Sequence, residues 1–263
     1  MIKRYGGSKT RVGLFVTCLV DIFRPTVGFA AVKLLEDAGC EVTVSANQTC
    51  CGQPMHNSGD IASSKAIAKQ VIDAFEDFDA VVTPSGSCGG MIKFHYPEIF
   101  MDEKEWQKRS EALSDKTYEL VSFLTDELNV TSVKASFEGS VTYHDSCSGL
   151  RELGVKEQPR KLLATVEGLK YKELYNANVC CGFGGVFCIK YSEISTRMVQ
   201  DKIKAVVDSG ANTLLAGDMG CLLNMSGRLT REGHNIEARH VAEILSDMTD
   251  GPAIGHSRWN NKP

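Results

Sequence analysis

Several features that would assign this 263-residue chain to a common class of protein are missing from its sequence. No apolar stretch approaches the ~20 residues that a membrane-spanning helix needs. The net charge is −4 and no Lys/Arg run stands out, so we expect no basic surface for nucleic acid or an anionic membrane. The absence of G-x-S-x-G, Walker A and G-x-G-x-x-G patterns argues against a serine hydrolase, an NTPase and a dinucleotide-binding enzyme.

The apolar run at residues 12–20 follows several basic residues and superficially resembles a signal peptide. It is short, Asp21 and Arg24 close it, and no A-x-A cleavage pattern follows. A buried strand explains the segment better. We therefore predict a cytoplasmic protein, and a hydrophobic content of 43% is enough to build a globular core.

Cysteine is present in unusual number, with ten residues. Eight of them form two sets with the same order and similar spacing, and each set contains a Cys-Cys-Gly triplet. Corresponding cysteines lie 129, 130 and 133 positions apart, which indicates an internal duplication. In a reducing cytosol such repeated spacing points to metal or redox chemistry before structural disulfides. The sets are Cys18, Cys50, Cys51 and Cys88, and Cys147, Cys180, Cys181 and Cys221.

The hydrophobic pattern around the cysteines also repeats. In the first half it predicts strands at 11–17, 41–45 and 80–83 and helices at 25–38 and 60–75. In the second half it predicts strands at 140–144, 170–174 and 213–216 and helices at 159–166 and 191–208. A further helix is expected at 118–128, in the connection. The sequence thus predicts an α/β fold of two pseudo-repeated Rossmann-like halves, 1–128 and 129–263, each a small parallel sheet flanked by helices.

Each cysteine group follows a predicted strand, so parallel pairing would bring each set of four to one edge of its sheet. Soft thiolates select zinc, copper(I) or iron–sulfur clusters. The side chains of adjacent cysteines point apart, so they suit a cluster with several metal ions better than a single tetrahedral zinc ion. We therefore predict an iron–sulfur cluster, most simply 4Fe-4S, at the eight cysteines. Zinc in one half, and a cluster-free thiol–disulfide oxidoreductase, stay open as alternatives.

The motifs that carry the cysteines resemble those of the duplicated cysteine-rich CCG family. This family includes the cysteine-rich subunit of heterodisulfide reductase and the iron–sulfur subunits of glycolate and anaerobic glycerol-3-phosphate dehydrogenases, and the resemblance is strongest to its lactate-utilization members. The resemblance spans essentially the whole chain. The segments that carry it are 13–21 (GLFVTCLVD), 49–54 (TCCGQP), 84–88 (PSGSC), 143–147 (YHDSC), 180–185 (CCGFGG) and 218–221 (DMGC).

The resemblance implies an iron–sulfur subunit of a system that oxidises L-lactate to pyruvate, acting with companion iron–sulfur and other lactate-utilization subunits. It implies an oxidoreductase subunit that is not complete alone. Because an iron–sulfur cluster usually passes one electron at a time, the two-electron step on lactate would belong to an organic cofactor elsewhere. Direct lactate binding at an open iron is the alternative.

The broader family pattern ends each set in C-x-x-C, whereas this chain has Ser85 and Asp218 at the first position of that pair. We expect both residues to cap the helices that follow, with ligation of iron through oxygen as the alternative. His144 precedes Cys147 by three residues, and it is either a donor near the metal or a core histidine. We expect Cys40 and Cys188 to be structural, and we give His56 no assigned role.

Overall fold

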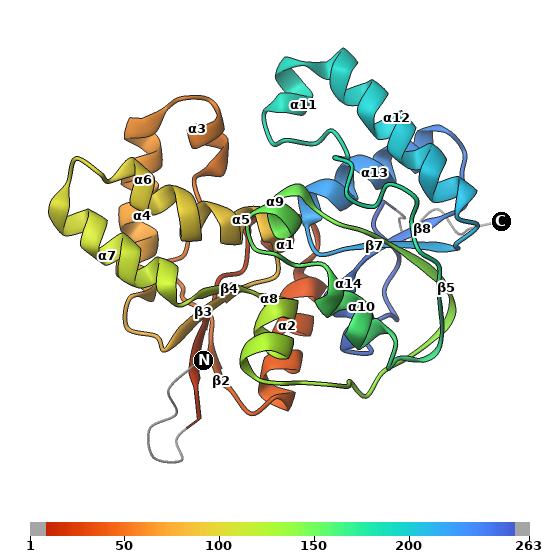
Figure 1. Cartoon of the computed structure of the whole chain (residues 1–263), viewed down its shortest axis with the longest axis horizontal. Coiled ribbons are helices and arrows are strands. Elements are labelled where there is room, and N and C mark those ends of the chain that lie inside the picture. The colour runs from red at the N-terminus through yellow and green to blue at the C-terminus, as the bar shows by residue number, and fades with distance from the viewer. Residues whose placement is uncertain (1–8, 256–263) are drawn as a thin grey trace.

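The computed structural model describes residues 9–255 and contains two four-stranded sheets, all of whose neighbouring strands are parallel (Figure 1). The first sheet has the order β2-β1-β3-β4 and the second β6-β5-β7-β8. In each sheet the first strand of its half is therefore internal, between the second and third strands. The strands are β1 (Arg11–Leu14), β2 (Glu41–Thr43), β3 (Ala80–Thr83), β4 (Thr117–Glu119), β5 (Ser136–His144), β6 (Glu167–Tyr171), β7 (Thr213–Ala216) and β8 (Glu237–His240).

Helices connect the strands and cover both sheets. In the first half they are α1 (Cys18–Phe23), α2 (Pro25–Asp37), α3 (Gln53–Asn57), α4 (Ile61–Phe75), α5 (Gly86–Gly90), α6 (Tyr96–Ile99), α7 (Lys104–Asp115) and α8 (Leu120–Ser122), with π-helical turns η1 (Met91–His95) and η2 (Phe123–Glu127). In the second half they are α9 (Cys147–Arg151), α10 (Glu157–Leu163), α11 (Phe187–Lys190), α12 (Ser192–Asp208), α13 (Met219–Arg231) and α14 (Val241–Leu245).

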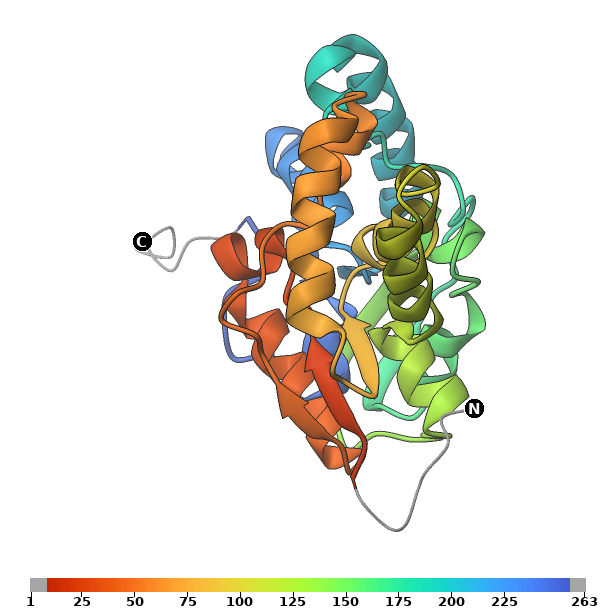
Figure 2. The same ribbon diagram turned by 90° about the vertical axis from the view of Figure 1, so that its left-hand side faces the viewer.

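The two sheets share one hydrophobic core. Side chains of α2, α8, α10 and α14 fill the space between the sheets, and Leu35, Leu120, Leu163 and Leu245 are among its buried members. Each sheet also has an outer core of its own, under α4 and α7 in the first half and under α12 and α13 in the second. Figure 2 shows α4 lying across the outer face of the first sheet. The sharing of one core fixes the two cysteine-bearing edges relative to each other.

The structure confirms the predicted fold class and corrects some elements. The strands at 80–83 and 213–216 and the helices at 25–38, 60–75 and 191–208 are present within one residue at each end. Each sheet has four strands where three were predicted. The strands missed are β4 and β8, which are short and lie outside the repeated cysteine frame. The predicted helix at 118–128 was wrong at its start, since Thr117–Glu119 pairs with β3 before the Glu119 side chain caps α8.

Several further boundaries were misplaced. The strand predicted at 41–45 ends at Thr43, the strand predicted at 140–144 starts at Ser136, and the helix predicted at 159–166 spans Glu157–Leu163. The strand predicted at 11–17 ends at Leu14, because the Thr17 side chain accepts a hydrogen bond from the Val20 N–H and starts α1. Cys18 is consequently the first residue of a helix. The strand predicted at 170–174 is β6, which lies three residues earlier. Among the described residues, no helix is both long and apolar enough to cross a membrane.

Candidate metal centres

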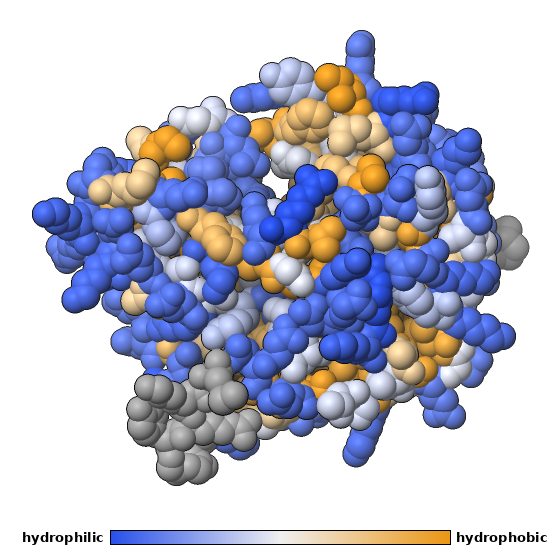
Figure 3. All heavy atoms as spheres, viewed as in Figure 1, coloured by the Kyte–Doolittle hydropathy of each residue, from blue (hydrophilic) through white to orange (hydrophobic). Residues whose placement is uncertain are grey.

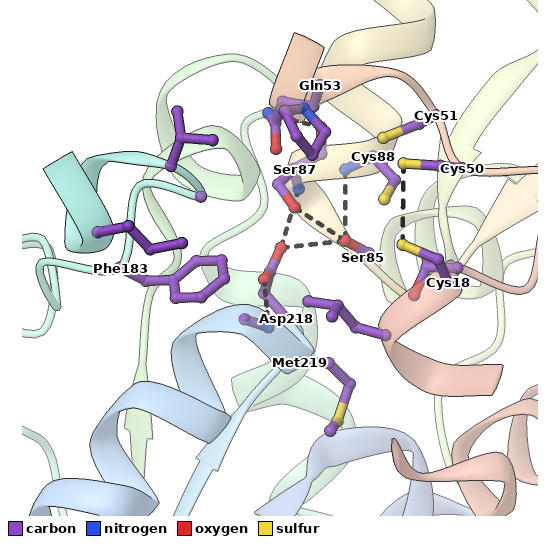
Figure 4. Close-up of a pocket in the computed structure, with 17 residues that line it drawn as sticks. Cys18, Cys50, Cys51, Gln53, Ser85, Ser87, Cys88, Phe183, Asp218 and Met219 are labelled. Carbon is purple, nitrogen blue, oxygen red and sulfur yellow. Dashed lines mark hydrogen bonds between the residues drawn. The ribbon is translucent and has the colours of Figure 1, made fainter. Parts of the chain in front are cut away.

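The first four cysteines meet at the carboxyl edge of the first sheet. Cys18 begins α1 after β1, Cys50 and Cys51 lie in the loop after β2, and Cys88 lies in α5 after β3. The Cys18 Sγ lies 3.8 Å from the Cys50 Sγ, and Cys51 contacts both Cys50 and Cys88 through its thiol. Figure 4 shows these four side chains gathered on one side of a cavity. Three segments far apart in the sequence thus place four sulfur atoms in one group.

The second four cysteines repeat this arrangement at the carboxyl edge of the second sheet. Cys180 contacts both Cys147 and Cys181, and Cys181 contacts Cys221, so the order of contacts matches that of the first set. Burial matches as well. The last two cysteines of each set are buried, whereas the first two are half-buried. All eight are free thiols, as metal ligation requires.

Hydrogen bonds within each set favour the deprotonated form of one cysteine. Hydrogen bonds from the thiols of Cys18 and Cys51 lower the pKa of Cys50 far below its usual range. In the second set, hydrogen bonds from Cys147 and Cys181 lower the pKa of Cys180 in the same way. Deprotonated sulfur is the form that binds metal, so the site is disposed toward thiolate ligation.

The glycine after each Cys-Cys pair turns its backbone toward the sulfur. Gly52 has φ 84° and Gly182 has φ 82°, in the left-handed region that favours glycine. The Gly52 N–H donates to the Cys50 Sγ at 3.4 Å, and the Gly182 N–H donates to the Cys180 Sγ at 3.3 Å. A Cβ at Gly182 would lie 2.8 Å from the Ser195 carbonyl oxygen. The Cys-Cys-Gly triplet therefore combines two sulfur ligands with an amide donor that stabilises negative charge on sulfur.

Residues of the second half close the first cysteine site. A cavity of about 240 Å³ has Cys18, Cys50, Cys51 and Cys88 in one wall. The opposite wall comes from the second half and includes Met219, and Figure 4 shows Phe183 and Asp218 across the cavity from the sulfur atoms. The spacing of the cysteines in the sequence does not indicate that residues of the second half line the first site. This arrangement brings the two cysteine edges together at the centre of the molecule.

Ser85 and Asp218 both cap helices, as expected, and they also contact each other. The Cys88 N–H donates to the Ser85 Oγ at 3.3 Å, and the Gly220 N–H donates to an Asp218 oxygen at 3.1 Å. The other Asp218 oxygen accepts hydrogen bonds from the Ser85 hydroxyl and the Ser87 N–H, both at 3.0 Å. Asp218 is only 4% exposed. Its carboxylate therefore caps α13 and also joins the two halves through hydrogen bonds to Ser85 and Ser87.

Replacing Asp218 with asparagine should weaken this joint without removing metal. The amide keeps the cap but presents an NH₂ group where the carboxylate accepted two hydrogen bonds, one of them from a main-chain N–H. We expect a loss of about 1–3 kcal/mol in the free energy of unfolding, measured by chemical denaturation, with iron content and visible spectrum unchanged. Asp60→Asn, at the exposed cap of α4, is the control and should cost less. A changed spectrum in Asp218→Asn with iron retained would show instead that the carboxylate is a ligand.

Three other residues weighed from the sequence have places of their own in the fold. Cys40 is buried in the shared core, as predicted. The Cys188 thiol, in α11, donates to the Gly185 carbonyl oxygen at 3.1 Å, which is a local contact with the loop that follows the second Cys-Cys pair. The His56 ring lies against the His95 ring in a tilted arrangement, with centroids 4.8 Å apart and an interplanar angle of 32°.

His144 lies beside the second set and is completely buried. Burial lowers its pKa to about 3, so the ring is neutral at physiological pH. An imidazole nitrogen of His144 and the Sγ atoms of Cys181 and Cys221 all lie within 4.8 Å of one another. The position agrees with both roles expected from the sequence, because the ring is buried and also lies beside two of the thiols.

Lys202, a buried lysine on α12, was not identified from the sequence. It is 2% exposed, and its Nζ donates to the Asn176 carbonyl oxygen at 2.6 Å. A signal was present, since Lys202 stands on the apolar face that contains Val199, Ile203 and Val206. A charged residue in such a register indicates a buried partner or a nearby anionic group.

Comparisons with known proteins agree with the duplication. A family model described as the CCG cysteine-rich domain matches residues 12–93 and 141–226. The chain is 49% identical over 240 residues to lactate utilization protein A of Bacillus cytotoxicus, covering 91% of this chain and 100% of that protein. It is 48% identical over 236 residues to lactate utilization protein A of a Geobacillus strain, covering 90% and 99%.

One solved structure has the same fold. A hypothetical protein from Helicobacter pylori superposes on 95% of this chain with a TM-score of 0.61 and 12% sequence identity. The chain spans about half of that structure, 52% of its length. At this identity the likeness concerns the fold alone.

Proposed function

The chain belongs to the cysteine-rich CCG family, and from this premise we propose that it is the iron–sulfur subunit of a system that oxidises L-lactate to pyruvate. The relative from Bacillus cytotoxicus is named lactate utilization protein A, and this chain matches it over its full length. In this proposal Cys18, Cys50, Cys51 and Cys88 hold one centre. Cys147, Cys180, Cys181 and Cys221 hold the other. Bound clusters supply single-electron transfer.

One observation carries the proposal: two groups of four thiols have the same order of sulfur contacts. Four thiolates match the ligand count of a cubane cluster. Adjacent cysteines, one half-buried and one buried, suit a multi-metal object more than a single ion. The glycine N–H groups that donate to Cys50 and Cys180 supply the hydrogen bonds to sulfur that such clusters receive.

Close packing of two cysteine-bearing helices supports electron transfer between the centres. Helix α5 carries Cys88 and helix α9 carries Cys147. A Cβ on Gly86 would lie 2.7 Å from the Gly149 Cα, so the two backbones touch. Glycine at both positions allows this approach. The centres of the two halves are thereby neighbours in one molecule.

Companion subunits belong to the proposal because lactate gives up two electrons and a hydride equivalent. That step normally uses a flavin, nicotinamide or other organic cofactor, for which the sequence contains no binding motif. Ile189, at the wall of the first cavity, is 78% exposed, and Tyr191 and Ile194 beside it are also exposed. Figure 3 shows hydrophobic residues beside the hollow between the two halves. We expect a companion iron–sulfur subunit to dock there.

Reversible reduction tests the proposal against its alternatives. Anaerobically purified protein should show broad visible absorption that dithionite bleaches and a mild oxidant restores, with an EPR signal in one of the two states. A thiol–disulfide oxidoreductase would lack the visible bands, and its changes would be reversed by dithiothreitol. A zinc scaffold would be colourless and would not respond to dithionite, and either result would reject the proposal.

A further inference from the structure

The two cysteine sites differ at the residue three places before the first cysteine. In the first half this residue is Phe15, and in the second half it is His144. Both side chains are fully buried. Phe15 packs edge-to-face against Phe75, with ring centroids 5.6 Å apart. The duplicated frame therefore places a hydrocarbon ring beside one set of sulfurs and an imidazole beside the other.

The environment of His144 fits a metal ligand. Neither ring nitrogen makes a well-formed hydrogen bond within residues 9–255, and a buried polar group without such a partner is costly. One nitrogen faces Cys181 and Cys221 within 4.8 Å. The backbone of Ala177 lies close to the ring. A metal-bound histidine commonly gives its other N–H to a backbone carbonyl, and Ala177 is placed for that role.

A second difference lies on the helices that follow the Cys-Cys pairs. Ser64 on α4 and Ser195 on α12 occupy matching places beside Gly52 and Gly182. Seven residues beyond each serine, the first half has Val71 and the second half has Lys202, both buried. Burial lowers the pKa of Lys202, and negative charge on Cys181, Cys147 or Cys180 nearby acts in the opposite direction.

The first site has no such lysine. Val71 stands in the corresponding place, and with Phe15 it belongs to apolar surroundings that include Cys51 and Cys88. A positive charge near a redox centre stabilises the reduced form, and a negative charge stabilises the oxidised form. Where the His144 imidazole takes the place of one of the four thiolates as ligand, the exchange of a thiolate for a neutral ring likewise raises the potential of an iron–sulfur centre.

We propose that His144 ligates the metal centre at the second cysteine set through an imidazole nitrogen and that this centre has a more positive potential than the all-cysteine first centre. The inference rests on the proposed iron–sulfur function. An electron on the reduced first centre then passes to the oxidised second centre, which becomes reduced. The second half is the electron acceptor within the molecule.

Pulsed EPR of the reduced second centre tests ligation directly. The first centre is removed with Cys51→Ser, so that one signal remains, and the protein is prepared with ¹⁴N- or ¹⁵N-histidine. A nitrogen coupling that changes with the isotope is expected. His144→Phe, which copies the first half, should abolish the coupling and shift the midpoint potential to more negative values. His144→Cys should also lose the coupling while retaining the centre, and it serves if His144→Phe fails to fold.

The control is His95→Gln, which removes a histidine outside both thiol groups and should keep coupling and potential. A reduced second centre without histidine coupling, or a coupling that persists in His144→Phe, would overturn the inference while leaving the proposed function intact. Zinc in place of iron at the second set would overturn the inference and half of that function. Absence of iron from both sets would reject both.

Discussion

Cys51→Ser is expected to remove the first metal centre and leave the second in place, and Cys181→Ser is expected to do the reverse. Each residue is buried at the middle of its thiol group and contacts two other cysteines. The hydroxyl is a much poorer ligand for soft metals than thiolate. Iron should fall to roughly half of the wild-type content in either variant, as expected for two independent thiolate-held clusters. Iron and sulfide analysis of anaerobically purified protein measures this.

Cys40→Ala is the matched control because Cys40 is also buried but lies in the shared core. It should keep the full iron content. Loss of a whole centre in Cys40→Ala would show that the ligand assignment is wrong. Loss of all iron in Cys51→Ser would show that the two sets form one site.

The isolated protein is expected to give no turnover with L-lactate and an artificial electron acceptor, even with both centres loaded. The full reaction should appear when the companion subunits are added. The reason is the two-electron step on lactate, for which this chain offers no cofactor-binding motif. Steady-state pyruvate formation, with and without the companions, measures the difference.

The Cys51→Ser variant serves as the control in the assembled system, where it should lower turnover sharply because one centre of the relay is missing. Turnover by the isolated protein that disappears in Cys51→Ser would contradict the relay. It would favour lactate binding at an iron of the first centre, beside the cavity that Phe183 and Asp218 enclose.

The sequence predicted the fold class because the cysteine frame and the hydrophobic pattern repeat together. Strands such as Ala80–Thr83 are fully buried and read as continuous apolar runs. The edge strands Thr117–Glu119 and Glu237–His240 contain charged residues and no such run. Their strand conformation comes from pairing with β3 and β7, which local pattern does not reveal.

For the candidate site, the sequence predicted which cysteines converge and which polar residues cap the helices. It did not predict that Asp218 and Phe183 of the second half would close the first site. That contact depends on the packing of the two halves around the shared core. The place of His144 beside Cys181 and Cys221 likewise needed the three-dimensional arrangement, because a buried histidine at the end of a strand has several possible roles.

Elemental analysis of protein purified without oxygen tests the central claim most directly. Two thiolate-held iron–sulfur centres predict brown protein in which iron and acid-labile sulfide are present in nearly equal amounts, with little zinc. Colourless protein with stoichiometric zinc and no sulfide would contradict the claim.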